Sequence, residues 1–186
     1  MNHVFVISGP SGVGKGTVCE LLLKNSANNL HWPKSYTTRT ERDSDKTENH
    51  YIFIDQTTFK QYENEGEIIE SNLYDSQLYG TSRSEIEKAL SENKNVLKEV
   101  DVNGGLALKK IYPESILIFL KNDLTTIRQR LAKRGQNSPE EIESRLKTAE
   151  KELEYENEYD YSIINPEGHP ERAIDAIEKI IQANDH

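Results

Sequence analysis

The chain has 186 residues, of which 34% are hydrophobic and 30% charged, and its formal net charge at pH 7 is −9. This length suits one domain with a modest insertion, and the negative charge argues against duplex nucleic acid as a partner, because that function needs a basic surface. The single cysteine excludes a disulfide framework, and no apolar run approaches the roughly 20 residues of a membrane span.

The first predicted elements are a buried strand at 4–8, a glycine-rich loop, and a helix from about Lys15 to Asn25. The loop fits the pattern G-x-x-x-x-G-K of a phosphate-binding loop, or P-loop, and comprises Gly9, Pro10, Ser11, Gly12, Val13, Gly14, Lys15, Gly16 and Thr17. Glycines let several backbone N–H groups converge on one point, the helix N-terminus adds partial positive charge, and Lys15 adds a full charge. These features predict a polyphosphate site.

The next stretch, residues 33–82, is predicted to be a small, mostly β insertion. Short strands are expected at 36–38, 51–54, 67–73 and 77–81, separated by polar loops. One helix is expected between Asp55, a suitable N-cap residue, and Gly66, which would end it.

The remainder of the chain alternates helix and strand. Helices are predicted from Ser82, over 104–111, from Asp123 to Lys133, from Ser138 to about Asn157 and over 170–183, and strands at 95–101, 115–120 and 161–164. Alternation of this kind favours a doubly wound parallel α/β sheet with helices on both faces, formed by residues 1–32 and 83–186. The acidic run at 150–160 is interpreted as a solvated helix face.

Several motifs occur together in a fixed order. They are Ser35-Tyr36-Thr37-Thr38-Arg39, Arg42, Tyr51, Glu70, Tyr79-Gly80-Thr81, Asp101, and Arg-Leu-x-x-Arg-Gly at 130–135. With the P-loop, they resemble the guanylate kinase family, P-loop nucleoside monophosphate kinases that phosphorylate GMP from ATP. The resemblance runs from about His3 to Asn165. It implies a P-loop NTPase-type fold in which residues 33–82 bind GMP and residues at about 134–155 form a helical lid.

The resemblance assigns the acceptor site. It implies that the GMP phosphate is held by Arg39, Arg42, Tyr51 and Tyr79, a set of two guanidinium groups and two phenols that can grip a phosphate dianion. It implies that Glu70 reads guanine, because one carboxylate can accept from both N1–H and the 2-amino group, whereas adenine has neither donor. Ser35, Thr81 and Asp101 match the other base contacts of the family.

The donor site follows from the same resemblance. It implies that the P-loop binds the ATP phosphates and that Asn165 lies near the adenine. Lys15 with the arginines Arg130, Arg134 and Arg145 would supply positive charge to the transferred phosphoryl group. Position 16 is a glycine where a hydroxyl residue usually contacts magnesium, so Mg²⁺ would be held mainly by the phosphates and by water. No protein metal site is predicted, because the five histidines do not cluster in the sequence.

Two other functions remain as alternatives. A related kinase could use the same fold on an acceptor such as a ribose bisphosphate, but Glu70, Ser35 and Thr81 argue for a guanine reader. A non-catalytic, guanylate-kinase-like binding module is opposed by Lys15 and the intact P-loop. The chain departs from the family in the loop at 43–50, which lacks glycine, and at Ser71, where a tryptophan is common. We expect a cytoplasmic enzyme, since the N-terminus lacks a signal-sequence pattern. No obligate protein partner is expected.

Overall fold

The computed structural model describes residues 2–43, 45, 50–74, 76–133 and 138–184. Its main sheet is five-stranded, and every strand in it runs parallel to its neighbours. The strand order is β2-β7-β1-β8-β9, with bounds Leu30–His31, Asn95–Glu99, Val4–Ser8, Ile116–Lys121 and Tyr161–Ile164. All five residues of β1 are buried, as a central parallel strand requires. The predicted doubly wound α/β fold is therefore confirmed.

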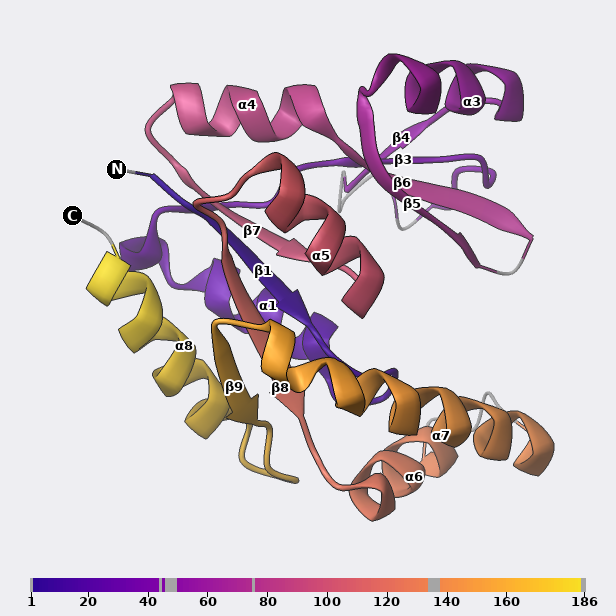
Figure 1. The fold of residues 1–186 in the computed structure, drawn as a ribbon, viewed down its shortest axis with the longest axis vertical. Coiled ribbons are helices and arrows are strands. Elements are labelled where there is room, and N and C mark those ends of the chain that lie inside the picture. Colours follow the sequence, from indigo (N-terminus) through magenta and orange to yellow (C-terminus); the bar gives the residue numbers. More distant parts are fainter. Residues whose placement is uncertain (1, 44, 46–49, 75, 134–137, 185–186) are drawn as a thin grey trace.

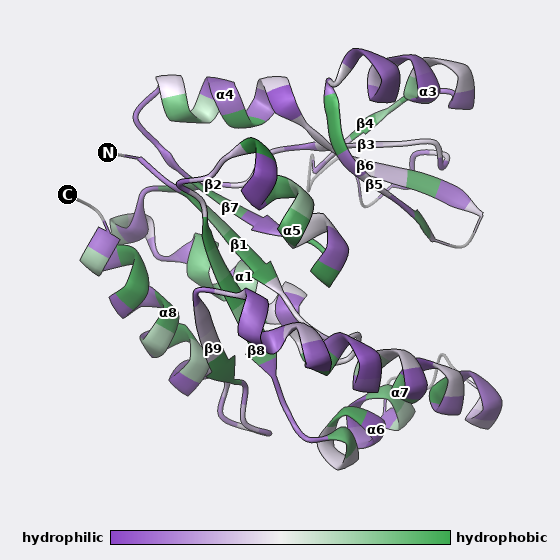
Figure 2. Ribbon diagram, viewed as in Figure 1, coloured by the Kyte–Doolittle hydropathy of each residue, from purple (hydrophilic) through white to green (hydrophobic). Residues whose placement is uncertain are grey.

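Helices cover both faces of this sheet (Figure 1). On one face, α1 (Lys15–Lys24) and α8 (Pro170–Asn184) pack in a cluster that contains Cys19, Leu22 and Ile177. On the other face lie α4 (Arg83–Ser91) and α5 (Val102–Ile111), whose buried residues join Val96 and Phe119. Figure 2 shows the hydrophobic central strands between these two helical layers.

The described residues between 35 and 82 include a second, four-stranded sheet of order β4-β3-β6-β5, which we call the small sheet. Its strands are β3 (Ser35–Thr37), β4 (Tyr51–Phe53), β5 (Ile68–Tyr74) and β6 (Gln77–Ser82). Helix α3 (Gln56–Glu65) covers it, with the fully buried Phe59 packed near Ile68. Asp55 caps α3 and Gly66 ends it, as the sequence predicts. Pairing of β5 with β6 shifts by one residue between Ile68 and Ser71, which is a β-bulge at residues 69–70.

Helices α6 (Leu124–Lys133) and α7 (Pro139–Leu153) pack on each other through their own cluster, which includes Ile127, Leu131 and Leu146. Ser138 forms a complete capping box with Glu141 at the start of α7. In Figure 1 this pair and the small sheet project from the same end of the main sheet, where β1 and β8 end.

The structure differs from the predicted elements in several details. Helix α7 ends at Leu153 and continues as a 3₁₀ turn over Glu154–Glu158. The two-residue strand β2 and the 3₁₀ turn at Ser26–Asn28 were not predicted, because such short segments carry no periodic signal. Most of the acidic run at 150–160 is exposed, as interpreted from the sequence, but Tyr159 within it is 9% exposed and packs against Phe119.

Candidate active site

The P-loop joins β1 to α1 and approaches the main sheet closely. A Cβ atom at Gly9 would lie 2.0 Å from the carbonyl oxygen of Leu120, so only glycine fits there. Gly14 has φ +96°, and a Cβ there would lie 2.7 Å from Nδ2 of Asn165. The Lys15 ammonium donates to the carbonyls of Gly9, at 2.7 Å, and Pro10, at 3.3 Å. The curled backbone and this cation lie together where the motif predicts a phosphate site.

A cleft of about 870 Å³, the central cleft, lies between the P-loop and the small sheet. Gly14, Lys15 and Arg145 line one end, and the side chains of Ser35, Tyr51, Glu70, Tyr79 and Asp101 line the other. Elements from distant parts of the sequence thus contribute to one cavity. It brings the predicted phosphate loop and most of the predicted acceptor residues together.

Glu70 is partly buried at the bulge of β5. The Thr81 hydroxyl donates to its Oε1 over 2.5 Å, and burial raises the pKa of Glu70. Asp101 caps α5: its Oδ1 accepts from the Gly104 N–H at 2.8 Å, and its Oδ2 accepts from the Asn72 side chain at 2.7 Å. These contacts fix both carboxyl groups at the cleft with defined orientations.

Arg39 lies beside two of the predicted phosphate ligands. Its guanidinium packs 4.9 Å from the ring centroid of Tyr51, which in turn contacts Tyr79 edge-on. Asp45 holds the guanidinium with two hydrogen bonds of 2.6 Å, and these bonds lower the pKa of Asp45 to about 2. The Arg42 N–H also donates to Asp45. The Arg42 side chain is exposed, and neither Arg39 nor Arg42 lines the central cleft. Asp45, which was not identified from the sequence, therefore fixes the Arg39 guanidinium and the backbone at Arg42.

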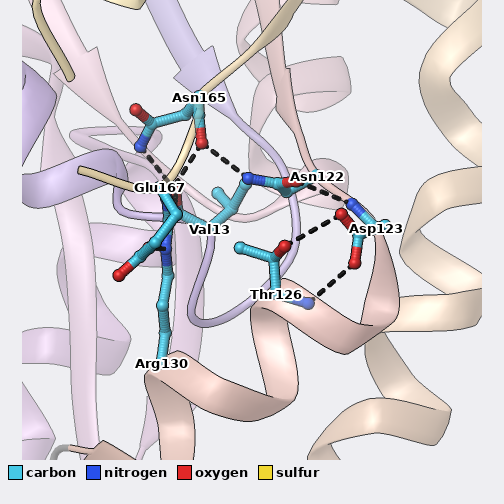
Figure 3. Close-up of polar contacts among 7 residues, drawn as sticks. All are labelled: Val13, Asn122, Asp123, Thr126, Arg130, Asn165 and Glu167. Carbon is cyan, nitrogen blue, oxygen red and sulfur yellow. Dashed lines mark hydrogen bonds and ion pairs between the residues drawn. The ribbon is translucent and has the colours of Figure 1, made fainter. Parts of the chain in front are cut away.

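A second pocket, of about 300 Å³, shares Gly12 and Gly14 with the central cleft and is also lined by Thr17, Arg130, Asn165 and Glu167. Figure 3 shows its contacts: Asn165 and Arg130 both donate to the Val13 carbonyl, at 2.8 and 2.6 Å. Arg130 also donates to the Asn165 carbonyl and to Glu167. Within the described residues, the Asn165 Oδ1 atom is buried and has no hydrogen-bond partner. Arg130 thus braces the P-loop against the segment after β9.

Helix α7 brings two charged side chains to the P-loop. Arg145 donates to the Ser11 hydroxyl at 3.1 Å, and the Ser11 N–H donates to Glu152 at 3.4 Å. Burial raises the pKa of Glu152, while Lys15 acts in the opposite direction. Arg134 lies outside the described residues. The contact of Glu152 with the P-loop was missed, because its acidic neighbours in the sequence suggested a solvated face.

Lys98 is a further residue that the sequence analysis missed. It lies in β7 with 2% exposure, and its ammonium donates to the Ser35 hydroxyl at 2.6 Å. The available signal was a lysine that follows Val96 and Leu97 within the predicted strand 95–101, because a central parallel strand is normally apolar.

The described residues contain no group of three or more His, Cys, Asp or Glu side chains placed to hold a metal ion. Position 16 offers no hydroxyl, and Thr17 lines the second pocket instead of the central cleft. Every helix within the described ranges is too short or too polar to cross a membrane.

Comparisons with known proteins agree with this geometry. A sequence model of the guanylate kinase family matches residues 1–184. The guanylate kinase of Nitrosomonas europaea is 39% identical over 184 residues, which cover 98% of this chain and 90% of that protein. The crystal structure of guanylate kinase from Anaplasma phagocytophilum aligns with a TM-score of 0.75 and 27% identity, over 99% of this chain and 86% of that chain.

A more distant structure shares the fold alone. Shikimate kinase from Bacteroides thetaiotaomicron aligns with a TM-score of 0.53 at 11% identity, over 97% of this chain and 98% of that one. The full-length family match and the 39% identity decide the family. The chain belongs to the guanylate kinase family.

Proposed function

We propose that this chain transfers the γ-phosphate of ATP to GMP or dGMP, giving ADP and the corresponding diphosphate. One observation carries the proposal: the central cleft has a P-loop lysine, Lys15, at one end and an oriented, partly buried carboxylate, Glu70, at the other. A polyphosphate fits the first end, and a base with two adjacent donors fits the second. Guanine has such a pair of donors, and adenine does not.

The small sheet, within residues 33–82, is the proposed GMP-binding subdomain. Glu70 would accept from the guanine N1–H and 2-amino groups, with Ser35, Thr81 and Asp101 completing the base site. Arg39, Arg42, Tyr51 and Tyr79 would hold the phosphate. The stacking of Arg39 on Tyr51 and the Asp45 ion pair support this role, because they hold the guanidinium in place before GMP binds. Arg42 would have to turn inward from its exposed position.

ATP would place its phosphates on the P-loop and its adenosine at the second pocket. Asn165 lines the second pocket, which supports this assignment, because a side-chain amide can hydrogen-bond to the edge of adenine. Arg130 would keep Asn165 and the P-loop in register through the Val13 and Asn165 carbonyls. The base of ATP and the base of GMP would thus lie in different pockets.

Phosphoryl transfer between two such nucleotides needs alignment and positive charge more than a covalent intermediate. Lys15 would bind the transferred group, and Arg145, which already contacts Ser11, would add charge from α7. We assign Arg134 the same role through the motif alone. Residues at about 134–155 would act as a lid that excludes water when both nucleotides are bound.

The set of side chains at the P-loop fits Mg²⁺ that enters with ATP. Because position 16 lacks a hydroxyl and Thr17 faces the second pocket, the protein offers few direct ligands. The phosphates and water molecules would therefore hold the ion, which would neutralise charge on the phosphates.

A coupled assay of ADP release with GMP, dGMP, AMP, CMP and UMP tests the proposal. We expect turnover with GMP and dGMP and almost none with the other three. Turnover with a ribose bisphosphate but not with GMP would favour the related small-molecule kinase, and no turnover with any acceptor would favour the binding module.

A further inference from the structure

Lys98 occupies an unusual position for a charged residue. It lies in β7, whose neighbours in the sheet are β1 and β2, and only 2% of it is exposed. The adjacent alternate positions, Val96 and Val100, belong to the apolar core beneath α4 and α5. Burial of an ammonium group is unfavourable unless its hydrogen bonds are satisfied, so a residue such as methionine would fit this strand better. The lysine therefore requires an explanation beyond packing.

The contacts of Lys98 all lie at the base end of the central cleft. Its ammonium donates to the Ser35 hydroxyl at 2.6 Å and to the Pro33 carbonyl at 3.3 Å, and it lies 5.4 Å from the Trp32 ring centroid. Burial lowers its pKa to about 8, so the group is still mostly charged at pH 7. Glu70 and Glu99 oppose that shift.

The direction of the bond to Ser35 has a chemical consequence. A charged ammonium has three donors and no acceptor, so the Ser35 oxygen must accept. The hydroxyl proton of Ser35 is therefore directed to a different atom. Ser35 and Lys98 both line the central cleft, so an acceptor on a bound base can receive this proton.

The partner of Ser35 across the small sheet has the opposite orientation. Ser35 is paired in register with Thr81, whose hydroxyl donates to Glu70. The Thr81 hydroxyl thus keeps the Glu70 carboxylate in place as an acceptor, and the Ser35 hydroxyl is left as a donor beside it. A 6-oxopurine presents the matching sequence on its edge, an acceptor oxygen at C6 next to the N1–H donor.

We infer that Lys98 is a positioning residue that directs the Ser35 hydroxyl toward the 6-oxo group of the acceptor purine. This inference rests on the proposed function, since it deepens the description of the same acceptor site. Lys98 acts through Ser35 and need not touch the base. Lys98 therefore affects whether the site prefers an oxygen or a sulfur atom at C6 of the purine.

The test compares GMP with 6-thioguanosine monophosphate. The thio analogue keeps N1–H and the 2-amino group, but its sulfur is a weak hydrogen-bond acceptor. The parent protein should prefer GMP in kcat/KM. Lys98→Met, which keeps the length of the side chain, should raise the KM for GMP about tenfold, leave the KM for ATP unchanged, and reduce the preference for GMP by a similar factor.

Two further variants make the test specific. Ser35→Ala should lose the same preference, and Lys98→Met combined with Ser35→Ala should lose no more than Ser35→Ala alone, because both changes remove one interaction. Lys109→Met, which removes a lysine that binds Ser115 and Asp160 outside the central cleft, is the matched control and should keep the preference. Circular dichroism verifies the fold of each variant, and Lys98→Gln replaces Lys98→Met if that variant does not fold, because its neutral amide can also accept and no longer forces the Ser35 oxygen to accept.

The possible outcomes distinguish a failure of the proposed function from a failure of this inference about Lys98. If the parent does not phosphorylate GMP, the proposed function fails. If the parent phosphorylates GMP, two results would overturn this inference. One is that Lys98→Met lowers activity toward GMP and 6-thioguanosine monophosphate equally. The other is that Lys98→Met adds its full effect to that of Ser35→Ala in the double variant.

Discussion

Thr81 donates its hydroxyl hydrogen to Oε1 of Glu70 across the paired strands β6 and β5. At the β-bulge of β5, at residues 69–70, Ile69 packs against the main core and Glu70 lines the central cleft. The second oxygen of Glu70, Oε2, lies close to Gly104, where a Cβ would be 3.1 Å away. The carboxylate is therefore held in one orientation before any base binds.

Thr81→Val should weaken GMP binding without affecting ATP. Valine keeps the shape of threonine but cannot donate to Glu70, and a hydrogen bond to a charged group contributes about 1.5–3 kcal/mol. We expect the KM for GMP to rise roughly tenfold to a hundredfold in steady-state kinetics. Thr58→Val, which removes a similar hydroxyl–carboxylate bond at the start of α3, is the control. Equal rises in the KM values for GMP and ATP would show that Thr81 supports the fold and not the base site.

Arg39→Lys should impair GMP binding although it keeps the positive charge. Lysine cannot make the two-point contact with Asp45 or stack on Tyr51, so the charge would no longer be held at the phosphate position. The KM for GMP should rise at least about tenfold. Arg128→Lys changes another arginine–carboxylate pair, with the exposed Glu143, and should have no effect on kinetics. An Arg39→Lys protein with parental kinetics would remove Arg39 from the phosphate site.

Lys15→Met should eliminate turnover and leave the fold intact. The variant loses the charge that the P-loop presents to phosphate, whereas the methionine fills most of the same space. Circular dichroism and ADP release on purified protein are the measurements, with Lys24→Met at the exposed end of α1 as the control. Activity within a few-fold of the parent would contradict the assigned role of the P-loop.

The stability of the Lys98→Met variant should depend on pH in a defined direction. The pKa of Lys98 falls from 10.5 to about 8 in the folded protein, where Glu70, Glu99 and Cys19 are the charged or titratable groups that act on it. Below pH 8 both the folded and the unfolded chains carry the charge, so the folded parent bears the full cost of burying it. Between pH 8 and pH 10.5 only the unfolded chain stays protonated, and the parent gains stability with rising pH.

The advantage of Lys98→Met in free energy of unfolding should therefore shrink by about 3 kcal/mol between pH 7 and pH 10.5. Urea unfolding of both proteins at several pH values measures the difference. A difference that stays constant across this range would mean that Lys98 does not titrate as its burial requires.

Most of the fold could be predicted because its signals are local. The apolar run at 116–120 and the P-loop after 4–8 indicate buried parallel strands, and Asp55, Ser138 and Gly66 mark helix ends through side-chain capping and positive φ. The short strand β2 and the 3₁₀ turns depend on tertiary packing, so no local sequence pattern predicts them.

The motifs predict site residues such as Lys15 and Glu70, and both line the central cleft. Lys98 and Glu152 were missed, because each has a charged neighbour in the sequence, Glu99 and Lys151, and only the fold shows that Lys98 is buried and that Glu152 contacts Ser11. The bulge at residues 69–70 was not predicted either, since it depends on how β5 pairs with β6.

The most direct test of the whole account is kcat/KM for GMP and AMP with the parent protein and with Glu70→Gln. Glutamine keeps the size of the side chain but loses the charge and turns an amide N–H₂ toward one guanine donor. A mispaired buried donor costs about 1–3 kcal/mol, and more when a charge is lost, so kcat/KM for GMP should fall about tenfold to beyond a hundredfold. For AMP, kcat/KM should be higher in Glu70→Gln than in the parent, and the KM for ATP should not change.

Glu63→Gln, on the exposed surface of α3, is the matched control and should behave like the parent. The account predicts that the GMP-to-AMP ratio of kcat/KM collapses only in Glu70→Gln. If that ratio is the same in Glu70→Gln as in the parent, Glu70 does not read the base, and the assignment of the small sheet as the guanine site is wrong.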